Sequence, residues 1–242
     1  MALFVGTSGW SYPEWRPAFY PEGLPQRSFL AHYASRLTSC EINATFYRLQ
    51  SETAVGRWAA ETPPGFRFAC KAHRALTHGR RLPSRPGEEE LLERFLESVA
   101  VLGERLGAVL FQLPPRSARD DAALAGLLSC LPRRLPFAVE FRHESWVARE
   151  VEERIAAAGG TVCLAETRGS VPERLPEGPL AYVRLRGDAY PDASREGWRE
   201  LLACEAAGRP VFVFAKHEGV PAGDPRAGVG LAEWLVAGAA PA

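Results

Sequence analysis

The sequence predicts an α/β fold, a single parallel (β/α)8 barrel that spans residues 1–242. The length is typical of a one-domain barrel of this kind. Short apolar runs rich in β-branched and aromatic residues recur eight times, and the gaps between them are long enough for helical crossovers. Most runs carry few polar residues before their last positions, as strands buried on both faces should. The predicted strands are residues 3–6, 39–43, 66–71, 108–112, 137–142, 161–166, 181–186 and 211–216.

Amphipathic helical patterns lie between these runs. One stripe follows three consecutive glutamates, whose charge complements a helix dipole. The three clearest stripes are Leu91, Phe95, Val99 and Leu102; Val147, Val151 and Ile155; and Leu30, Tyr33 and Leu37. Alternating strands and helices require right-handed crossovers in a parallel sheet, and eight units close it. An open doubly wound sheet is the alternative, but the first strand lacks a G-x-G-x-x-G fingerprint.

Composition narrows the functional classes. The 29 basic and 29 acidic residues cancel, so no global field favours nucleic acid or an anionic membrane. The five cysteines are odd in number and form no C-x-x-C pair, which argues against a disulfide framework and fits a reducing cytoplasm. The start lacks a leader pattern, and no run of eighteen apolar residues occurs, so we expect a cytoplasmic protein without a membrane partner. The oligomeric state is left open.

Two predicted connections are long, at residues 12–26 and 72–87. Each follows a strand and precedes a helix, which places both on the face where barrels form active sites. Trp10 and Tyr12 belong to an aromatic group near the first connection, which either walls a pocket or anchors the loop. The second connection holds His78 and an arginine-rich stretch around Arg80 and Arg81.

Polar side chains gather where the predicted strands end. Because alternate residues share a face of a strand, several of these positions should point into one pocket once the barrel closes. They are Glu41, Asn43, Lys71, Gln112, Glu140, Arg142, Glu166, Arg184, Arg186 and Lys216. Lys71 and Lys216 are the only lysines in the chain, and both occupy such ends. The alternative is that these charges merely cap strands where the chain meets solvent.

The cations in this set favour a small anionic ligand, and Arg184, Arg186 and Lys216 lie on the last two strands, where barrels often hold phosphate. Glu41, Glu140 and Glu166 supply a general acid or base, or oxygen ligands for a divalent metal. A partly buried lysine among other cations has a lowered pKa, which would suit Lys71 as a base or a Schiff-base nucleophile. A salt bridge from Lys71 to Glu41 or Glu140 is the structural alternative.

Five runs together resemble a known family. They are GTSGW (6–10), EINATFYR (41–48), FQLPP (111–115), EFRHESW (140–146) and YVRLRG (182–187), and they resemble the YecE-like family, domain of unknown function 72. The resemblance spans nearly the whole chain and implies a fold similar to TIM barrels, but no established activity. Its motif positions correspond here to Glu41, Asn43, Thr45, Tyr47, Lys71, His78, Gln112, Glu140 and Arg142. Glu166 stands where Asp is usual, Arg186 where His is usual, and FAKHE (214–218) replaces an asparagine-rich run.

The leading hypothesis is an enzyme, a hydrolase, lyase or isomerase, that acts on a small anionic, phosphorylated or sugar-like substrate by acid/base chemistry without an organic cofactor. The catalytic candidates are Glu41, Lys71, Glu140 and Glu166. The substrate-binding candidates are Ser8, Trp10, Tyr12, Asn43, Thr45, Tyr47, His78, Gln112, Arg142, Arg184, Arg186 and Lys216. We expect Lys71→Ala or Glu41→Gln to abolish turnover while leaving the melting temperature nearly unchanged.

The sequence leaves two alternative functions open. One is a metal-dependent phosphodiester hydrolase with Glu41, Glu140 and Glu166 as oxygen ligands. The other is a non-catalytic protein that binds an anionic metabolite, or RNA through Arg80 and Arg81, although the neutral net charge disfavours RNA.

Overall fold

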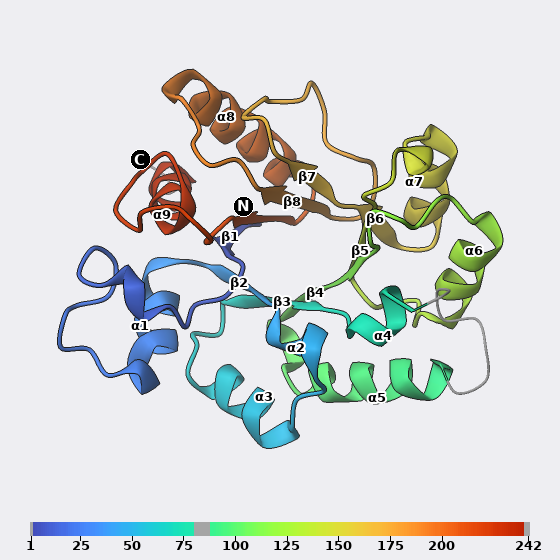
Figure 1. Ribbon diagram of the computed structural model, residues 1–242, viewed down its shortest axis with the longest axis horizontal. Coiled ribbons are helices and arrows are strands. Elements are labelled where there is room, and N and C mark those ends of the chain that lie inside the picture. The colour runs from blue at the N-terminus through green and yellow to red at the C-terminus, as the bar shows by residue number, and fades with distance from the viewer. Residues whose placement is uncertain (1, 80–87, 240–242) are drawn as a thin grey trace.

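A computed structural model describes residues 2–79 and 88–239 of the chain (Figure 1). All strand pairs within this part are parallel, and the strands form two sheets, in the orders β1-β9-β8-β7 and β2-β3-β4-β5-β6. The strands are β1 (Leu3–Thr7), β2 (Ser39–Ile42), β3 (Arg67–Lys71), β4 (Leu106–Gln112), β5 (Phe137–Glu140), β6 (Gly160–Val162), β7 (Leu164–Glu166), β8 (Ala181–Leu185) and β9 (Val211–Ala215). The predicted α/β fold with parallel strands is therefore confirmed.

Helices follow most strands and lie outside the ring of strands in Figure 1. They are α1 (Phe29–Arg36), α2 (Ala44–Tyr47), α3 (Glu52–Ala60), α4 (Arg74–Thr77), α5 (Glu88–Ala100), α6 (Asp121–Cys130), α7 (Arg149–Ala157), α8 (Asp192–Gly208) and α9 (Gly228–Ala239). Some of them begin with a side-chain cap. Ser51 accepts a hydrogen bond from the amide of Ala54 at the start of α3, and Asp120 accepts one from the amide of Ala123 at the start of α6. The three predicted stripes lie on α1, α5 and α7 or just beyond their ends.

A continuous eight-stranded barrel is not what the strand pairing shows. The run predicted as one strand, residues 161–166, is two short strands that belong to different sheets, β6 beside β5 and β7 beside β8. The break falls at Cys163, whose amide donates to the carbonyl of Val139, 2.9 Å away. Beyond this residue the chain leaves β5 and pairs with β8 instead.

The second interruption lies between β1 and β2, where a tyrosine side chain replaces strand pairing. The hydroxyl of Tyr33 accepts the amide of Thr7 at 2.7 Å and donates to the carbonyl of Ser39 at 3.0 Å. The two strands approach closely here, because a Cβ on Gly6 would lie 1.8 Å from the Ser39 oxygen. A side chain thus completes the contact that a backbone ladder would otherwise make.

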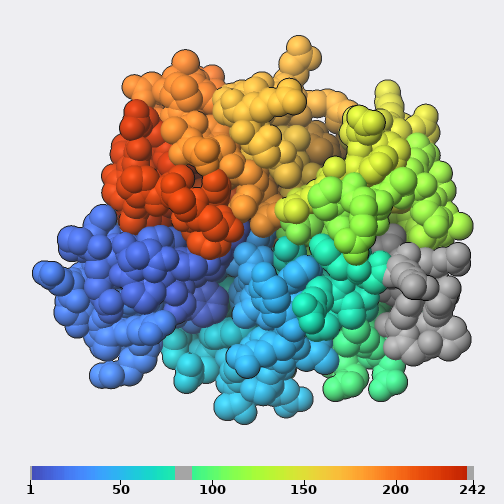
Figure 2. Space-filling model, viewed as in Figure 1, coloured from blue at the N-terminus to red at the C-terminus, as the bar shows by residue number. Residues whose placement is uncertain are grey.

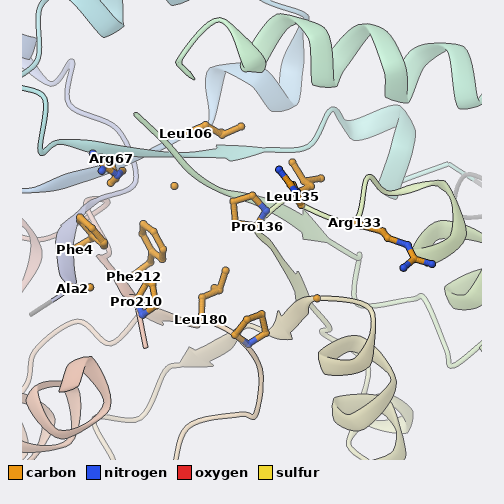
Figure 3. A pocket seen from close by; sticks show the side chains of 14 residues that line it. Ala2, Phe4, Arg67, Leu106, Arg133, Leu135, Pro136, Leu180, Pro210 and Phe212 are labelled. Carbon is orange, nitrogen blue, oxygen red and sulfur yellow. The ribbon is translucent and has the colours of Figure 1, made fainter. Parts of the chain in front are cut away.

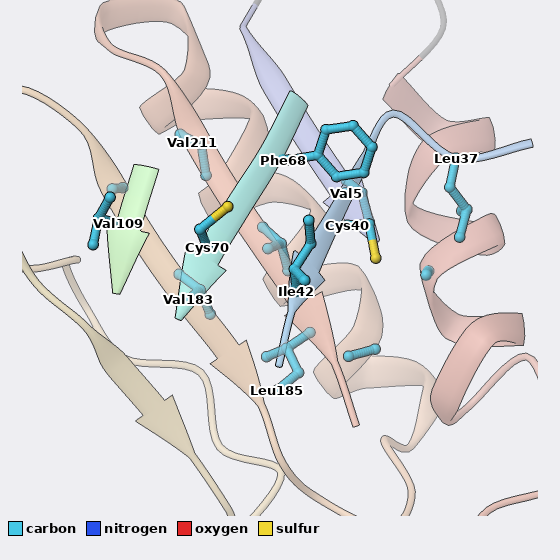
Figure 4. Packing of buried hydrophobic residues seen from close by; sticks show 14 of the residues in the cluster. Val5, Leu37, Cys40, Ile42, Phe68, Cys70, Val109, Val183, Leu185 and Val211 are labelled. Carbon is cyan, nitrogen blue, oxygen red and sulfur yellow. The ribbon is translucent and has the colours of Figure 1, made fainter. Parts of the chain in front are cut away.

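Alternate residues of the strands face two different cores. Val5, Cys40, Cys70 and Val183 belong to the outer core beneath the helices, part of which Figure 4 shows. Their neighbours face inward, and the inner cluster draws on both sheets. It consists of Ala69, Ala108, Leu110, Ala138, Cys163, Leu180, Tyr182, Phe212 and Phe214. The last inward positions of several strands carry the polar residues of the site.

The chain ends close on each other. In Figure 2 the C-terminal part, in red, lies directly against the N-terminal part, in blue. Strands β1 and β9 pair along their whole length, from Leu3 opposite Val211 to Thr7 opposite Ala215. Within residues 2–79 and 88–239, no helix combines the length and apolar character that crossing a membrane requires.

Candidate functional site

Glu41, on β2, is a fully buried carboxylate. Its Oε1 accepts hydrogen bonds from Ser8 Oγ and from Arg184 Nη2, both at 2.9 Å, and its Oε2 accepts one from the hydroxyl of Tyr182 at 2.8 Å. These donors come from β8 and from the loop after β1. The carboxylate therefore joins strands that lie in different sheets.

Glu140 is the second buried carboxylate, at the end of β5. Its Oε2 accepts from Arg184 Nη1 at 2.6 Å and from Gln112 Nε2 at 2.8 Å, and its Oε1 accepts from Arg142 Nε at 2.9 Å. Burial alone would raise its pKa, but Arg184 and the hydrogen bonds from Gln112 and Arg142 outweigh burial and lower the pKa. Glu140 is thus held as a carboxylate.

Arg184 joins the two carboxylates and is itself only 3% exposed. Burial opposes its charge, yet Glu41 and Glu140 raise its pKa above the ordinary arginine value. A planar guanidinium with several donors suits this double bridge. We call Glu41, Glu140 and Arg184 the buried charge cluster. Because Arg184 already serves both carboxylates, it is not a free anion ligand as the sequence suggested.

Lys71, the last residue of β3, lies beside this cluster. Its Nζ is 4.1 Å from the ring centroid of Phe46 and forms no hydrogen bond or ion pair with the residues that the structure describes. Burial and the nearby charge of Arg184 lower its pKa to about 8, although Glu41 and Glu140 act in the opposite direction. Near neutral pH this amine can therefore both hold and release a proton.

A second basic side chain, His78, also contacts Phe46. The imidazole of His78 packs against it with ring centroids 5.0 Å apart, and His78 Nδ1 lies 2.9 Å from the hydroxyl of Thr77. Burial lowers the pKa of His78, and the charges of Lys71 and Arg142 lower it further. Lys71 and His78 thus both contact the ring of Phe46.

A hollow of about 260 Å³, lined in part by Gly9, Ile42 and Asn43, opens beyond the carboxyl ends of β1 and β2. Trp10 and Trp58 form one wall, with ring centroids 5.7 Å apart in an edge-to-face arrangement. Asn43 also lines it, and its buried Oδ1 has no hydrogen-bond partner among the described residues. We call this space the mouth hollow. It offers an aromatic wall and one acceptor that a ligand donor would satisfy.

Other candidates lie apart from the buried charge cluster. Glu166 accepts hydrogen bonds from the amide of Ser170 at 3.2 Å and from the hydroxyl of Tyr190 at 2.7 Å. Lys216 pairs with Asp188, and Arg186 pairs with Glu218 at 3.2 Å. These three side chains are engaged around the last strands instead of converging on Glu41 and Glu140.

The remaining candidates have local roles. The hydroxyl of Thr45 lies 2.7 Å from the carbonyl oxygen of Lys71 and so ties α2 to β3. The hydroxyl of Tyr12 donates to the carbonyl of Ser8 at 2.7 Å, and its ring stacks on His217 at 4.2 Å. Tyr47 is 66% exposed. Arg80 and Arg81, proposed as an RNA contact, lie outside the described residues.

The carboxylates do not form one set of metal ligands. Glu41 and Glu140 bind Arg184, whereas Glu166 binds Ser170 and Tyr190. Across residues 2–79 and 88–239, no three His, Cys, Asp or Glu side chains are grouped as a metal ion would require. The residues present therefore do not fit the three-glutamate metal site.

Phe46 and Trp58 escaped the sequence interpretation, and Tyr182, in the YVRLRG run, was not among the predicted site residues. Phe46 lies within the EINATFYR run, so its position beside Lys71 had a sequence signal. Tyr182 faces the same side of its strand as Arg184, two residues on, which is also a readable signal. Trp58 lies on α3, and only tertiary packing brings it against Trp10.

The fold and the site define a parallel α/β protein with charged residues buried at the carboxyl ends of its strands. The chain belongs to the family described as protein of unknown function DUF72, whose model matches residues 4–235. It is 30% identical over 211 residues to the UPF0759 protein YunF of Bacillus subtilis strain 168, covering 81% of this chain and 72% of that protein. It is 29% identical over 195 residues to the UPF0759 protein YecE of Escherichia coli K12, covering 80% of this chain and 66% of that one.

Two crystal structures show a similar fold. A DUF72 family protein of Thermotoga maritima MSB8 superposes with a TM-score of 0.77 at 23% identity, covering 98% of both chains. One from Enterococcus faecalis V583 gives 0.76 at 19% identity, covering 98% of this chain and 95% of that one. At these identities the likeness concerns the fold alone.

Proposed function

We propose that this chain is an enzyme that binds a small anionic molecule at the carboxyl ends of its strands and transfers a proton through Lys71. The observation that carries the proposal is the state of Lys71: an amine with a pKa near 8, without a partner in the described part of the chain, beside a buried charge cluster. General acid/base groups work best when their pKa lies near the working pH.

Charge explains the preference for an anion. Within the group formed by Lys71, Arg142 and the buried charge cluster, three cations face two carboxylates, so one positive charge is in excess while Lys71 is protonated. Arg142 is bound to Glu140 through Nε, and its side chain is 41% exposed, which leaves its outer nitrogens toward solvent. Lys71 and Arg142 are therefore the residues that bind the anion. Glu41 and Glu140 influence the pKa of Lys71 without contacting the substrate.

The mouth hollow would receive the uncharged part of the same substrate. Its tryptophan wall suits the apolar face of a sugar ring, and Asn43 Oδ1 is an acceptor left for a hydrogen bond from a sugar hydroxyl. A phosphorylated or carboxylated sugar combines both features. Because this chain spans only about two thirds of its E. coli relative, the proposal concerns this chain alone.

The architecture that goes with this proposal is one interrupted (β/α)8 barrel. Its support is that the inner cluster takes residues from both sheets, and that Arg184 of one sheet binds Glu41 and Glu140 of the other. Functional residues at the carboxyl ends of strands are the rule in such barrels.

The test begins with ligand-induced thermal shifts for inorganic phosphate, sugar phosphates and sugar acids, followed by turnover measured by NMR for every compound that binds. We expect at least one sugar phosphate or sugar acid to bind and turn over. Lys71→Met should abolish both properties, Lys71→Arg should keep binding but lose turnover, and Arg94→Met, on the exposed face of α5, should change neither.

Two results would contradict the proposal. Turnover that survives in Lys71→Met removes the proton-transfer role of the lysine. Binding without turnover of any compound would instead support the rival function, a non-catalytic protein that binds an anionic metabolite.

A further inference from the structure

We infer a second binding site at the opposite, amino-terminal end of the strands, for a small carboxylate with an apolar body, such as a medium-chain fatty acid. A hollow of about 530 Å³ opens there, within the size range of small-molecule sites (Figure 3). Phe4 of β1, Leu106 of β4, Phe212 of β9 and Leu180, just before β8, contribute to its walls. The inference is independent of the function proposed for the other end.

One wall of this hollow is aromatic and is formed by Phe4 and Phe212. Phe212 stacks on Phe4 with ring centroids 4.9 Å apart, and its ring lies so close to Gly107 that a Cβ there would be 2.5 Å away. The two phenylalanines are thus fixed side by side and form an aromatic wall.

The charges around this hollow have one sign. Its charged lining residues are Arg67, Arg133 and Arg134, and none of its lining residues in the described part of the chain is acidic. Figure 3 shows Arg67 beside Phe4, whereas Arg133 extends away from the open space. Arg67 is therefore the cation best placed to meet a bound ligand.

Arg67 is anchored but not neutralised. Its Nη1 donates to the carbonyls of Pro64 at 2.8 Å and Phe66 at 3.1 Å, and the guanidinium lies 5.6 Å from the Phe4 ring centroid. It forms no ion pair within the described residues. An arginine without a carboxylate partner, at the edge of an apolar hollow, matches an anion whose remaining surface is apolar.

The experiment is isothermal titration of the purified chain with decanoate, below its micelle concentration, with decanol and butyrate as comparison ligands. We expect decanoate to bind at one site, and decanol and butyrate to bind at least about tenfold more weakly. Arg67→Met should weaken decanoate binding about tenfold and leave decanol unchanged, because a single charge-assisted contact is lost. Arg67→Lys should restore most of the affinity for decanoate. Arg149 is an exposed arginine that pairs with Glu153, and Arg149→Met should leave the affinity unchanged.

A second variant tests the location without altering charge. Leu180→Trp should fill the hollow and abolish decanoate binding, while the binding of inorganic phosphate at Lys71 and Arg142, measured in a separate titration, persists. The inference is overturned if wild-type protein does not bind decanoate, if neither Arg67→Met nor Leu180→Trp weakens binding, or if Lys71→Met is the variant that abolishes it. Analytical ultracentrifugation at the same concentrations is the final control. A dimer that forms without ligand and dissociates as decanoate is added would assign the hollow to a second copy of the chain and overturn the inference.

Discussion

At the carboxyl ends of the strands the inward positions hold Glu41, Glu140 and Arg184, whereas toward the amino ends most inward positions hold apolar residues such as Ala138 and Phe212. The change takes place within two residues, from Ala138 to Glu140 and from Tyr182 to Arg184. Replacing buried ion pairs by apolar side chains often leaves stability unchanged or improves it. Stability alone therefore does not explain why the buried charge cluster lies at this end, whereas the proposed anionic ligand accounts for it.

The largest effect should come from breaking the buried charge cluster at its centre. Arg184→Met leaves two buried carboxylates without their shared cation, and we expect a loss of roughly 3–5 kcal/mol in the free energy of unfolding. Urea denaturation measures it. The triple variant Arg184→Met, Glu41→Gln and Glu140→Gln should recover much of the loss. A single variant as stable as wild type would mean that the cluster does not exist as described.

A smaller loss should follow from Glu41→Gln, and this revises the expectation drawn from the sequence. Glu41 is fully buried and paired with Arg184, so the amide should cost about 2–3 kcal/mol, because its single carbonyl oxygen can replace only one of the two oxygens to which Ser8, Arg184 and Tyr182 donate. Lys71→Met should by contrast leave the melting temperature unchanged or raise it, because it removes a charge that burial disfavours. Equal melting temperatures for the two variants would contradict this distinction.

At the amino ends, shape and not charge should limit substitutions. Gly107→Ala places a methyl group 2.5 Å from the Phe212 ring, and we expect a loss of about 1–3 kcal/mol from overpacking. Gly65→Ala is the matched control, because a Cβ there meets nothing within 4 Å. If both alanines cost the same, the tight approach of Gly107 to Phe212 is not real.

The last effect concerns pH. The pKa of Lys71 is about 8 in the folded chain and near 10.5 when unfolded, so between these values the unfolded state binds more protons. Folding stability should therefore rise with pH across this window, and anion binding should fall, since the lysine loses its charge. Comparing wild type with Lys71→Met at each pH isolates the contribution of this residue. A difference that does not vary from pH 7 to 10.5 would contradict it.

The sequence predicted which residues meet at the carboxyl ends of the strands, but not how they bind each other. Strand periodicity and polar strand ends correctly brought Glu41, Gln112, Glu140 and Arg184 to one place, because these follow from alternation and parallel order. Hydrogen-bond partners do not follow from alternation, so the double bridge of Arg184 could not be predicted.

The interruptions of the strand pairing could not be predicted for a similar reason. Tyr33 is a helix-stripe residue, and nothing in its spacing shows that its hydroxyl bridges the backbones of β1 and β2. Cys163 interrupts an apolar run without any turn residue, so the change of sheet at this position is set by tertiary pairing alone. Glu166 ends β7 and Lys216 directly follows β9, yet Tyr190 and Asp188, in the loop after β8, bind them and hold them away from the cluster.

The proposed chemistry is tested most directly by titrating the two lysines, which selective isotope labelling would make the only side-chain amine signals in an NMR spectrum. Assignment with Lys71→Met identifies the signal of Lys71. The account predicts a pKa of about 8 for Lys71, rising in Arg184→Met because a neighbouring positive charge is gone. A pKa near the ordinary 10.5, unaffected by that substitution, would contradict it.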